Sequence, residues 1–394
     1  MNNFIYYTPT KVFFGKKEEE KVGSIISEYG YKKVLLHYGK SSIKTSGLYD
    51  RVVSSLKEAN LEVYELGGVE ANPKIGLVRD GVKLVKENGV DFILAVGGGS
   101  VIDSAKAISN GAKVDFDPWL FSIKEQTPKD HVPLGTILTL SASGSAMSDS
   151  CVITNPEVGL KRGFNSPHNR PLFSVLNPEL TYTVDKYQTA CGIVDSMMHT
   201  LERYLTKPGS FEVSDNIALA ILKTIKNNAM LAYNEPYNYE ARSNIMWAES
   251  LSHNSLTGCG NSFVMLVHQL EHELSGKFDR IAHAAGLSAL FCGYLKYIYR
   301  ENLDKICELG YTLYNIERTQ ENYNEKERVA LQTIEEFKKF FISIGMPTSL
   351  SELDVYEDSF VEMANKLSKN KTVVLKGIID LDYNAIIDIF ELSK

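Results

Sequence analysis

Residues 91 to 108 place a buried strand, a glycine loop and a helix directly after one another. The run Asp91–Val96 (DFILAV) is typical of a strand buried on both faces, and three glycines and a serine follow it. A helical pattern, VIDSAKAI, begins immediately after them. Because a strand that leads straight into a helix is the repeating unit of a parallel sheet covered by helices, this feature predicts an α/β fold.

The remainder of the first 187 residues repeats this alternation. Short apolar runs predict further strands at Lys33–Tyr38, Leu61–Leu66 and Pro133–Leu140. Helical spacing predicts helices at Gly47–Ala59 and from Ile75 onward. Strands that alternate with helices indicate a parallel, doubly wound sheet of the Rossmann-like type.

The frequency of turn-forming residues changes near position 188. The first 187 residues hold 18 of the 28 glycines and nine of the 12 prolines. We therefore expect an α/β domain at 1–187 and an all-α domain at 188–394. Helical periodicity in the second half is clearest at Asp195–Leu205, Ser214–Tyr233, Ala241–Ser252, Leu266–Leu274 and Glu325–Ser343.

Charge and cysteine content exclude several classes of function. The formal net charge is −7, which argues against a nucleic-acid partner or an anionic membrane surface. No apolar run approaches the roughly 20 residues of a membrane helix, and the first residues do not have the pattern of a signal peptide. The five cysteines are scattered, without CxxC pairs, which excludes a disulfide scaffold and favours a cytoplasmic location.

The glycine loop at 97–100 has the chemistry of a pyrophosphate site. Glycines allow the backbone to approach a ligand closely, and the helix N-terminus supplies N–H donors and a positive dipole end. The loop lacks GxGxxG spacing, so a tight strand–helix turn is the alternative reading. A second loop, Gly39-Lys40-Ser41, is not a P-loop, because the required first glycine would fall at Val34.

Histidines and one aspartate in the second half form a candidate metal-ligand set. Asp195 and His199 are four residues apart, and so are His268 and His272, so each pair shares one helix face. With His283 they suit a borderline divalent metal such as zinc or ferrous iron. The segment from His268 to His272 also matches HxxEH, the inverted zinc-protease motif, which would leave the glycine loop and Asp195 without a role.

Taken together, ordered motifs along nearly the whole chain resemble the iron-containing (group III) alcohol dehydrogenases, most closely their NADPH-dependent butanol-dehydrogenase branch, with the dehydroquinate synthase-like fold. The motifs are YGKSSIKTSGLYD (38–50), EANP (70–73), GGGSVIDSAKA (97–107), DPWLF (117–121), TLSASGSAMS (139–148), VITNPEVGLKRGF (152–164), QTACGIVDSMMHTLE (188–202), YEARSNIMWAESLSHNSLTG (239–258) and HQLEHELSG (268–276).

This resemblance implies a site in each half. A nicotinamide dinucleotide would be bound by residues of the first half: Gly39, Ser41, Ser42, Asn72, Gly97, Gly98, Gly99, Ser100, Asp103, Thr139, Leu140, Ser143 and, by a looser match, Lys161. One divalent metal, Fe²⁺ or Zn²⁺, would be held by Asp195, His199, His268 and His283. His272 would lie beside the metal and is the candidate catalytic residue, as a proton relay.

The implied activity is hydride transfer between the nicotinamide and a short- or medium-chain alcohol or aldehyde such as butanol or butanal. NAD-preferring relatives often place an aspartate in the loop after the strand predicted at Lys33–Tyr38, where this chain has Gly39. A carboxylate there would repel a 2′-phosphate, so its absence predicts a preference for NADP(H) over NAD(H). A homodimer is the family expectation.

Three departures from the family pattern motivate alternatives. The segment before His283 is one residue longer than usual, and Ala284 and Ala146 stand where a glycine and a glutamate are expected. One alternative is a metal-deficient, NADP(H)-binding relative without alcohol dehydrogenase activity. Another is a dehydrogenase of a different polyol on the same fold.

Overall fold

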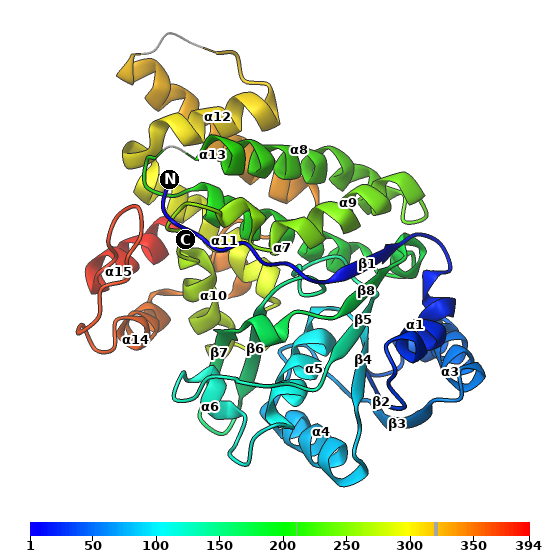
Figure 1. The fold of residues 1–394 in the computed structure, drawn as a ribbon. Helices are drawn as coiled ribbons and strands as arrows, with labels where there is room; N and C mark the ends of the chain where they lie inside the picture. The colour runs from blue at the N-terminus through cyan, green and yellow to red at the C-terminus, as the bar shows by residue number, and fades with distance from the viewer. Residues whose placement is uncertain (210, 319–321) are drawn as a thin grey trace. The chain divides into compact units, whose positions relative to one another are not determined.

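The computed structural model describes residues 1–209, 211–318 and 322–394, which divide into two compact units (Figure 1). The α/β unit consists of Tyr7–Val184 and Pro236–Ser250, and the helical unit of Met1–Tyr6, Asp185–Glu235 and Leu251–Lys394. The helical unit begins at Asp185, three residues before the expected division at 187/188, and two further segments are placed differently. The first six residues join the helical unit, and residues 236–250 return to the α/β unit.

The α/β unit is built on a six-stranded parallel sheet in the order β1-β8-β5-β4-β2-β3. Its strands are β1 (Lys11–Phe14), β2 (Lys33–Tyr38), β3 (Glu62–Leu66), β4 (Phe92–Gly97), β5 (Leu134–Leu138) and β8 (Phe173–Leu176). The four strands predicted from the sequence are β2 to β5, and the parallel, doubly wound arrangement is confirmed. The short edge strand β1 and its neighbour β8 were not predicted.

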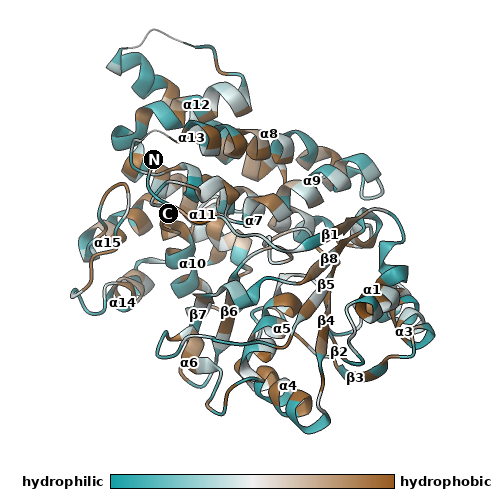
Figure 2. Ribbon diagram, in the orientation of Figure 1, coloured by the Kyte–Doolittle hydropathy of each residue, from teal (hydrophilic) through white to brown (hydrophobic). Residues whose placement is uncertain are grey.

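Two hydrophobic cores cover the two faces of this sheet. Helices α1 (Val22–Glu28) and α3 (Leu48–Glu58) lie on one face, and α4 (Ile75–Asn88) and α5 (Gly99–Gly111) lie on the other (Figure 1). Every residue of β4 and β5 is buried, and Figure 2 shows the central strands as a hydrophobic layer. Burial on both faces is the reason these strands read as continuous apolar runs.

The strand order creates a switch point between β2 and β4. After β2 the chain turns to α3 on one face, whereas after β4 it turns to α5 on the opposite face. The loops that follow these adjacent parallel strands therefore diverge at their carboxyl ends, which is where open α/β sheets bind ligands. The loops are residues 39–41 and the glycine loop at 97–100.

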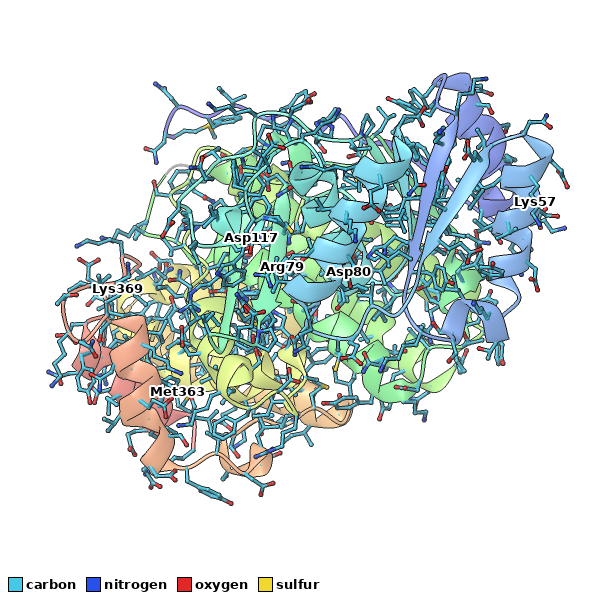
Figure 3. The ribbon with its side chains drawn as sticks, turned by 90° about the horizontal axis from the view of Figure 1, so that it is seen from below. Lys57, Arg79, Asp80, Asp117, Met363 and Lys369 are labelled. Carbon is cyan, nitrogen blue, oxygen red and sulfur yellow. The ribbon has the colours of Figure 1, made fainter. Side chains whose placement is uncertain are left out.

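A two-stranded antiparallel sheet, β6 (Ser150–Asn155) with β7 (Leu160–Asn165), completes the α/β unit together with α2 (Ser42–Thr45), α6 (Trp119–Ser122) and most of α9 (Tyr239–Ser252). Neither the hairpin nor the placement of α9 was predicted. Arg79 of α4 forms an ion pair with Asp117, just before α6, at 2.6 Å (Figure 3). It forms a second with Glu157, in the hairpin turn, at 3.1 Å. This ion-pair network joins α4 to the hairpin.

The helical unit is organised around α11, which packs against α7, α10, α13 and α15. Nearly every residue of α11 is buried, and a Cβ added at Gly286 would lie 2.8 Å from Cγ of Glu271, so glycine at this position allows close approach of α10. A helix that is apolar on all sides belongs in the centre of a bundle. The helices are α7 (Lys186–Tyr204), α8 (Glu212–Asn234), α10 (Leu266–Lys277), α11 (His283–Ile298), α12 (Leu303–Tyr314), α13 (Tyr323–Ser343), α14 (Glu357–Leu367) and α15 (Tyr383–Leu392).

Candidate metal centre and nucleotide-binding loops

One carboxylate oxygen in the helical unit faces three imidazoles. Oδ1 of Asp195 lies 3.4 Å from Nδ1 of His199, its neighbour one turn along α7. The same oxygen lies 3.5 Å from Nε2 of His268 on α10 and 3.9 Å from Nε2 of His283, the first residue of α11. Three helices therefore bring together the four residues that the resemblance implied as metal ligands.

Three atoms of this cluster are buried without a hydrogen-bond partner among the described residues: Oδ1 of Asp195, Nδ1 of His199 and Nε2 of His268. Leaving buried polar atoms unsatisfied is costly, so such atoms are rare unless a ligand or ion satisfies them. One carboxylate and three imidazoles fit Zn²⁺ or Fe²⁺, and four protein ligands leave room for a substrate oxygen if the coordination expands. The residues present therefore fit one divalent cation.

Two buried glutamates orient the imidazoles of His268 and His283 by binding the ring nitrogen that points away from Asp195. Nδ1 of His268 hydrogen-bonds to Glu202 of α7, and Nδ1 of His283 hydrogen-bonds to Glu271 of α10. Because a carboxylate can only accept, each Nδ1 must donate, and Nε2 is left as the nitrogen toward Asp195, where it offers a lone pair to a cation once it has lost its proton. Carboxylate–histidine pairs of this kind fix the tautomer and ring orientation at metal sites.

The carboxylates also set the electrostatics of the centre. Burial alone would lower the pKa of His268, but the negative charges of Glu202 and Asp195 outweigh it and raise that pKa to about 9. Burial, with the neighbouring imidazoles of His253 and His268, lowers the pKa of His199 well below its usual range. The centre thus combines neutral imidazole with carboxylates that favour positive charge, which suits a cation.

The glycine loop packs directly against the loop after β5. A Cβ added at Gly99 would lie 2.2 Å from Oγ of Ser143, and one added at Gly98 would lie 3.2 Å from Cβ of Leu140. The backbone N–H of Thr139 donates to the carbonyl of Gly97 at 3.1 Å. Only glycine allows this approach, so the structure brings the predicted positions 97–100, 139, 140 and 143 together at the N-terminus of α5.

The loop after β2 lies beside the same helix end. The Cβ position of Gly39 is 3.8 Å from the side chain of Val101, in the first turn of α5. Ser41 and Ser42 follow at the start of α2. The cation of this loop, Lys40, forms an ion pair with Glu70 at 2.7 Å. The expected cofactor residues of the two loops thus meet at the switch point of the sheet.

Asn72 and Lys161 come from different elements that meet at Thr154. Asn72 has a left-handed backbone (φ 53°) shortly before α4. Thr154 of β6 donates from its backbone to the carbonyl of Pro73 at 2.8 Å and pairs with Lys161 of β7 in the hairpin. The hairpin, which the sequence did not predict, therefore holds Lys161 near the loop of Asn72.

Charged side chains fix the loop that follows Ser143. Asp103 accepts from the hydroxyl of Ser145 at 2.5 Å and from the N–H of Val152 at 2.9 Å, so its carboxylate positions the loop. Nζ of the fully buried Lys106 donates to oxygens of Ser145, Ser148 and Ser150.

Glu249 of α9 accepts from the N–H of Gly144 at 2.5 Å. It is fully buried and lies 105 residues further along the chain, so it was missed from the sequence.

Comparison with known proteins identifies the chain. A family model described as iron-containing alcohol dehydrogenase matches residues 9–178, and one described as Fe-containing alcohol dehydrogenase family, C-terminal, matches residues 189–392. The chain belongs to the iron-containing alcohol dehydrogenases. The resemblance seen in the motifs is confirmed, and the chain is an enzyme of this oxidoreductase family.

Iron-containing alcohol dehydrogenases from several bacteria match the chain over its full length. NADH-dependent butanol dehydrogenase A of Clostridium acetobutylicum is 39% identical over 394 residues, 100% of both chains. NADPH-dependent aldehyde reductase YqhD of Escherichia coli is 34% identical over 401 residues, again 100% of both. The crystal structure of NADH-dependent butanol dehydrogenase A from Thermotoga maritima has a TM-score of 0.94 at 34% identity, covering 100% of this chain and 99% of that one. The predicted fold is therefore confirmed.

In this iron-containing alcohol dehydrogenase, hydrogen bonds hold the turn between α10 and α11, which carries the segment before His283. The N–H of Phe278 donates to Leu274, and the N–H of Ile281 donates back to Phe278, both at 2.9 Å. Arg280 anchors the turn by donating to the carbonyl of Leu353 at 2.8 Å. This turn places His283 at the Asp195 cluster.

His272 lies one turn beyond His268 on α10, and its ring centroid is 5.5 Å from that of His283. Its ligand atoms group with those of Glu271 and His283 rather than with those of Asp195, His199 and His268. Two further neighbours were missed from the sequence. Glu202 follows Asp195 by seven residues on the same face of α7, a spacing that could have revealed it. The ring of His253 lies 4.0 Å from that of His199.

No helix in the described ranges is both long and apolar enough to cross a membrane.

Proposed function

We propose that this iron-containing alcohol dehydrogenase is a metal-dependent, NADP(H)-preferring reductase of short- and medium-chain aldehydes such as butanal, and oxidises the corresponding alcohols. The observation that supports this most directly is the set of buried, unsatisfied ligand atoms on Asp195, His199 and His268. The names of the relatives, which include butanol dehydrogenases and an aldehyde reductase, support the substrate class.

A divalent cation at Asp195, His199, His268 and His283 would polarise the substrate oxygen as a Lewis acid. Glu202 and Glu271 keep the Nε2 lone pairs of His268 and His283 turned toward Asp195, so the ligand set is arranged in advance. Because Glu271 is buried and bonded to His283, it does not act as the water-activating base of an HxxEH protease.

The cofactor supplies the hydride, and the α/β unit would hold it at the switch point. The N–H groups at the start of α5 are the donors for its pyrophosphate, and Gly97, Gly98 and Gly99 let it approach the backbone. Asp103, Lys106 and Glu249 fix the neighbouring loop at 143–150. The proton gained by the substrate oxygen would come from His272, our candidate relay.

The preference for NADP(H) rests on the loop after β2. None of residues 39–42 is acidic, and Lys40 provides a cation, although Glu70 shares its charge. Some relatives are named as dependent on NADH and others on NADPH, so the prediction of cofactor preference depends on the loop of this chain. We expect kcat/KM with NADPH to exceed that with NADH. A higher value with NADH would show the preference to be wrong.

The decisive experiment measures NADPH consumption with butanal under anaerobic conditions, on metal-stripped protein to which Fe²⁺ or Zn²⁺ is returned. We expect turnover only with metal, and its loss together with metal binding in His268→Ala. His272→Asn should retain metal but lose rate; if it keeps the full rate, His272 is not the relay. Tight NADPH binding without turnover under either metal would favour a non-catalytic relative or a different alcohol. We also expect a homodimer, which light scattering tests.

A further inference from the structure

Two histidines that the proposed function does not use face each other in the α/β unit. His131 precedes β5, and His168 lies in the short 3-10 turn Pro167–Asn169. Their Nδ1 atoms are 3.0 Å apart, and their ring centroids are 4.9 Å apart. Only one proton fits between the two nitrogens, so at least one of them presents a lone pair to the other. Both side chains are half-buried.

Consecutive residues of α5 hold both segments in place. The hydroxyl of Ser109 donates to the carbonyl of Val132 at 2.6 Å, and the backbone carbonyl of Ser109 accepts from the N–H of Val132 at 3.0 Å, directly beside His131. Asn110 donates to the side chain of Asn169 at 2.7 Å, directly beside His168. Ser109 and Asn110 are completely buried. One helix therefore fixes the backbone under both imidazoles, and such preorganisation favours ligand binding.

The two nitrogens share a hydrogen bond, and their separation also equals that of two adjacent ligands on one metal ion. With metal–nitrogen distances of about 2.0–2.1 Å, adjacent ligands lie about 2.8–3.0 Å apart in square-planar geometry and about 3.3–3.4 Å apart in tetrahedral geometry. The observed 3.0 Å is close to the square-planar value, which Cu²⁺ and Ni²⁺ adopt. Burial, and then the neighbouring His168, lower the pKa of His131, so its ring is neutral and able to ligate at neutral pH.

We propose that His131 and His168 form a second metal site, which binds a divalent transition-metal cation through both Nδ1 atoms. Copper should be preferred over nickel and zinc, because imidazole ligation follows the Irving–Williams order. The site belongs to the α/β unit, whereas the Asp195 cluster belongs to the helical unit. Since two residues provide the protein ligands, the remaining coordination positions stay available to water or a small chelator.

The test uses Cu²⁺–nitrilotriacetate, a chelate that leaves two adjacent coordination positions for protein ligands. The full chain, with the Asp195 cluster loaded with Zn²⁺, is titrated with this probe and followed by calorimetry and pulsed EPR. We expect one Cu²⁺ per chain, with two imidazole nitrogens in the EPR signal. His131→Gln and His168→Gln should each weaken binding at least ten-fold, and the nearby surface variant Lys129→Gln should leave it unchanged.

Several results would overturn the proposal. These are absence of copper binding, equal binding by the parent and the two histidine variants, or an EPR signal from a single imidazole. The EPR measurement on the parent protein counts the coordinated imidazoles without any substitution, so it decides the question even if a variant folds poorly. Thermal melting without copper shows whether each variant is folded.

Discussion

Glu202 of α7 and His268 of α10 share a hydrogen bond that crosses between the two helices, 66 residues apart in the chain. The same carboxylate accepts from the backbone N–H of Val267, so it also anchors the first turn of α10. One buried glutamate thus determines both where His268 lies and which of its nitrogens faces Asp195.

Replacing this glutamate should weaken metal binding without removing a ligand. In Glu202→Gln, the amide can donate as well as accept, and the ring of His268 loses its fixed orientation. We expect the affinity for Zn²⁺ to fall about 10–100-fold, as is usual when such a partner is changed. Competition with a fluorescent chelator measures this. The exposed Glu212→Gln on α8 is the control, and equal affinities in the two variants would contradict the positioning role.

Metal binding should stabilise the helical unit. A cation at one hundred times its Kd adds about 2.7 kcal/mol to the free energy of unfolding, which raises Tm by roughly 5 °C or more. Differential scanning calorimetry with and without a chelator measures the change. The shift should vanish in Asp195→Ala, since the oxygen common to all three imidazoles is lost. A shift that persists in this variant would assign the stabilising metal to another place.

Removing the buried cation of Lys106 should affect cofactor binding and stability together. Burial lowers the pKa of Lys106, which nevertheless donates to oxygens of three serines in the loop beside the glycines. Lys106→Met leaves these acceptors unsatisfied and should cost about 3 kcal/mol of stability and raise the KM for the cofactor at least ten-fold. Lys113→Met, just beyond α5, is the control. An unchanged KM would limit Lys106 to a role in stability.

Cofactor preference should be reversible at Gly39. A side chain fits there, because an added Cβ would meet its nearest neighbours only at ordinary contact distances of 3.7 and 3.8 Å. Gly39→Asp places a carboxylate where a 2′-phosphate would be repelled. We expect the ratio of kcat/KM for NADPH over NADH to fall at least ten-fold. Gly39→Asn, equal in size but neutral, should change it little, and equal ratios in both variants would exclude the charge effect.

The stability of the α/β unit should decline in acid through His37. This residue of β2 is fully buried, with Nδ1 2.8 Å from the carbonyl of Leu66 and Nε2 2.9 Å from Oγ of Ser104, and burial lowers its pKa from 6.5 to about 4. The unfolded chain therefore binds more protons between pH 6.5 and 4. His37 contributes full stability above pH 6.5 and loses about 3 kcal/mol as the pH falls to 4.

Urea unfolding of the parent and of His37→Gln across this pH range tests the prediction. The variant should be less stable at pH 7, but the difference between the two proteins should shrink toward pH 4. The other histidines titrate in both proteins, so their contribution cancels when the free energy of unfolding of the variant is subtracted from that of the parent. A difference that stays constant with pH would show that His37 has the same pKa in the folded and unfolded chains, which would contradict the prediction.

Local patterns in the sequence predicted local structure well. The strands β2 and β4 and the glycine loop follow from short apolar runs and their flanking residues. Asp195 with His199, and His268 with His272, follow from helical spacing. Each of these features depends on residues within one turn or one strand, where periodicity carries the information.

Features that depend on distant pairing could not be predicted. The edge strand β1 has four residues and gains its partner, β8, only 162 positions later in the register Lys11 with Phe173. Glu249 meets Gly144, and His131 meets His168, only because the fold returns the chain to these places. No single segment contains both members of such a pair, so only the folded structure reveals them.

Residues 236–250 belong to the α/β unit, although the segments before and after them belong to the helical unit. This arrangement limits how segments of related enzymes can be joined into one chimeric chain. A chimera made with one crossover near residue 187 would combine the Gly144 loop of one parent with the Glu249 of another. A chimera that exchanges the complete α/β unit must take α9 from the same parent. This requires additional crossovers near residues 235 and 250. Among chimeras made with a single crossover, those whose Gly144 loop and α9 do not match would therefore be lost, even if the active sites of both parents are fully functional.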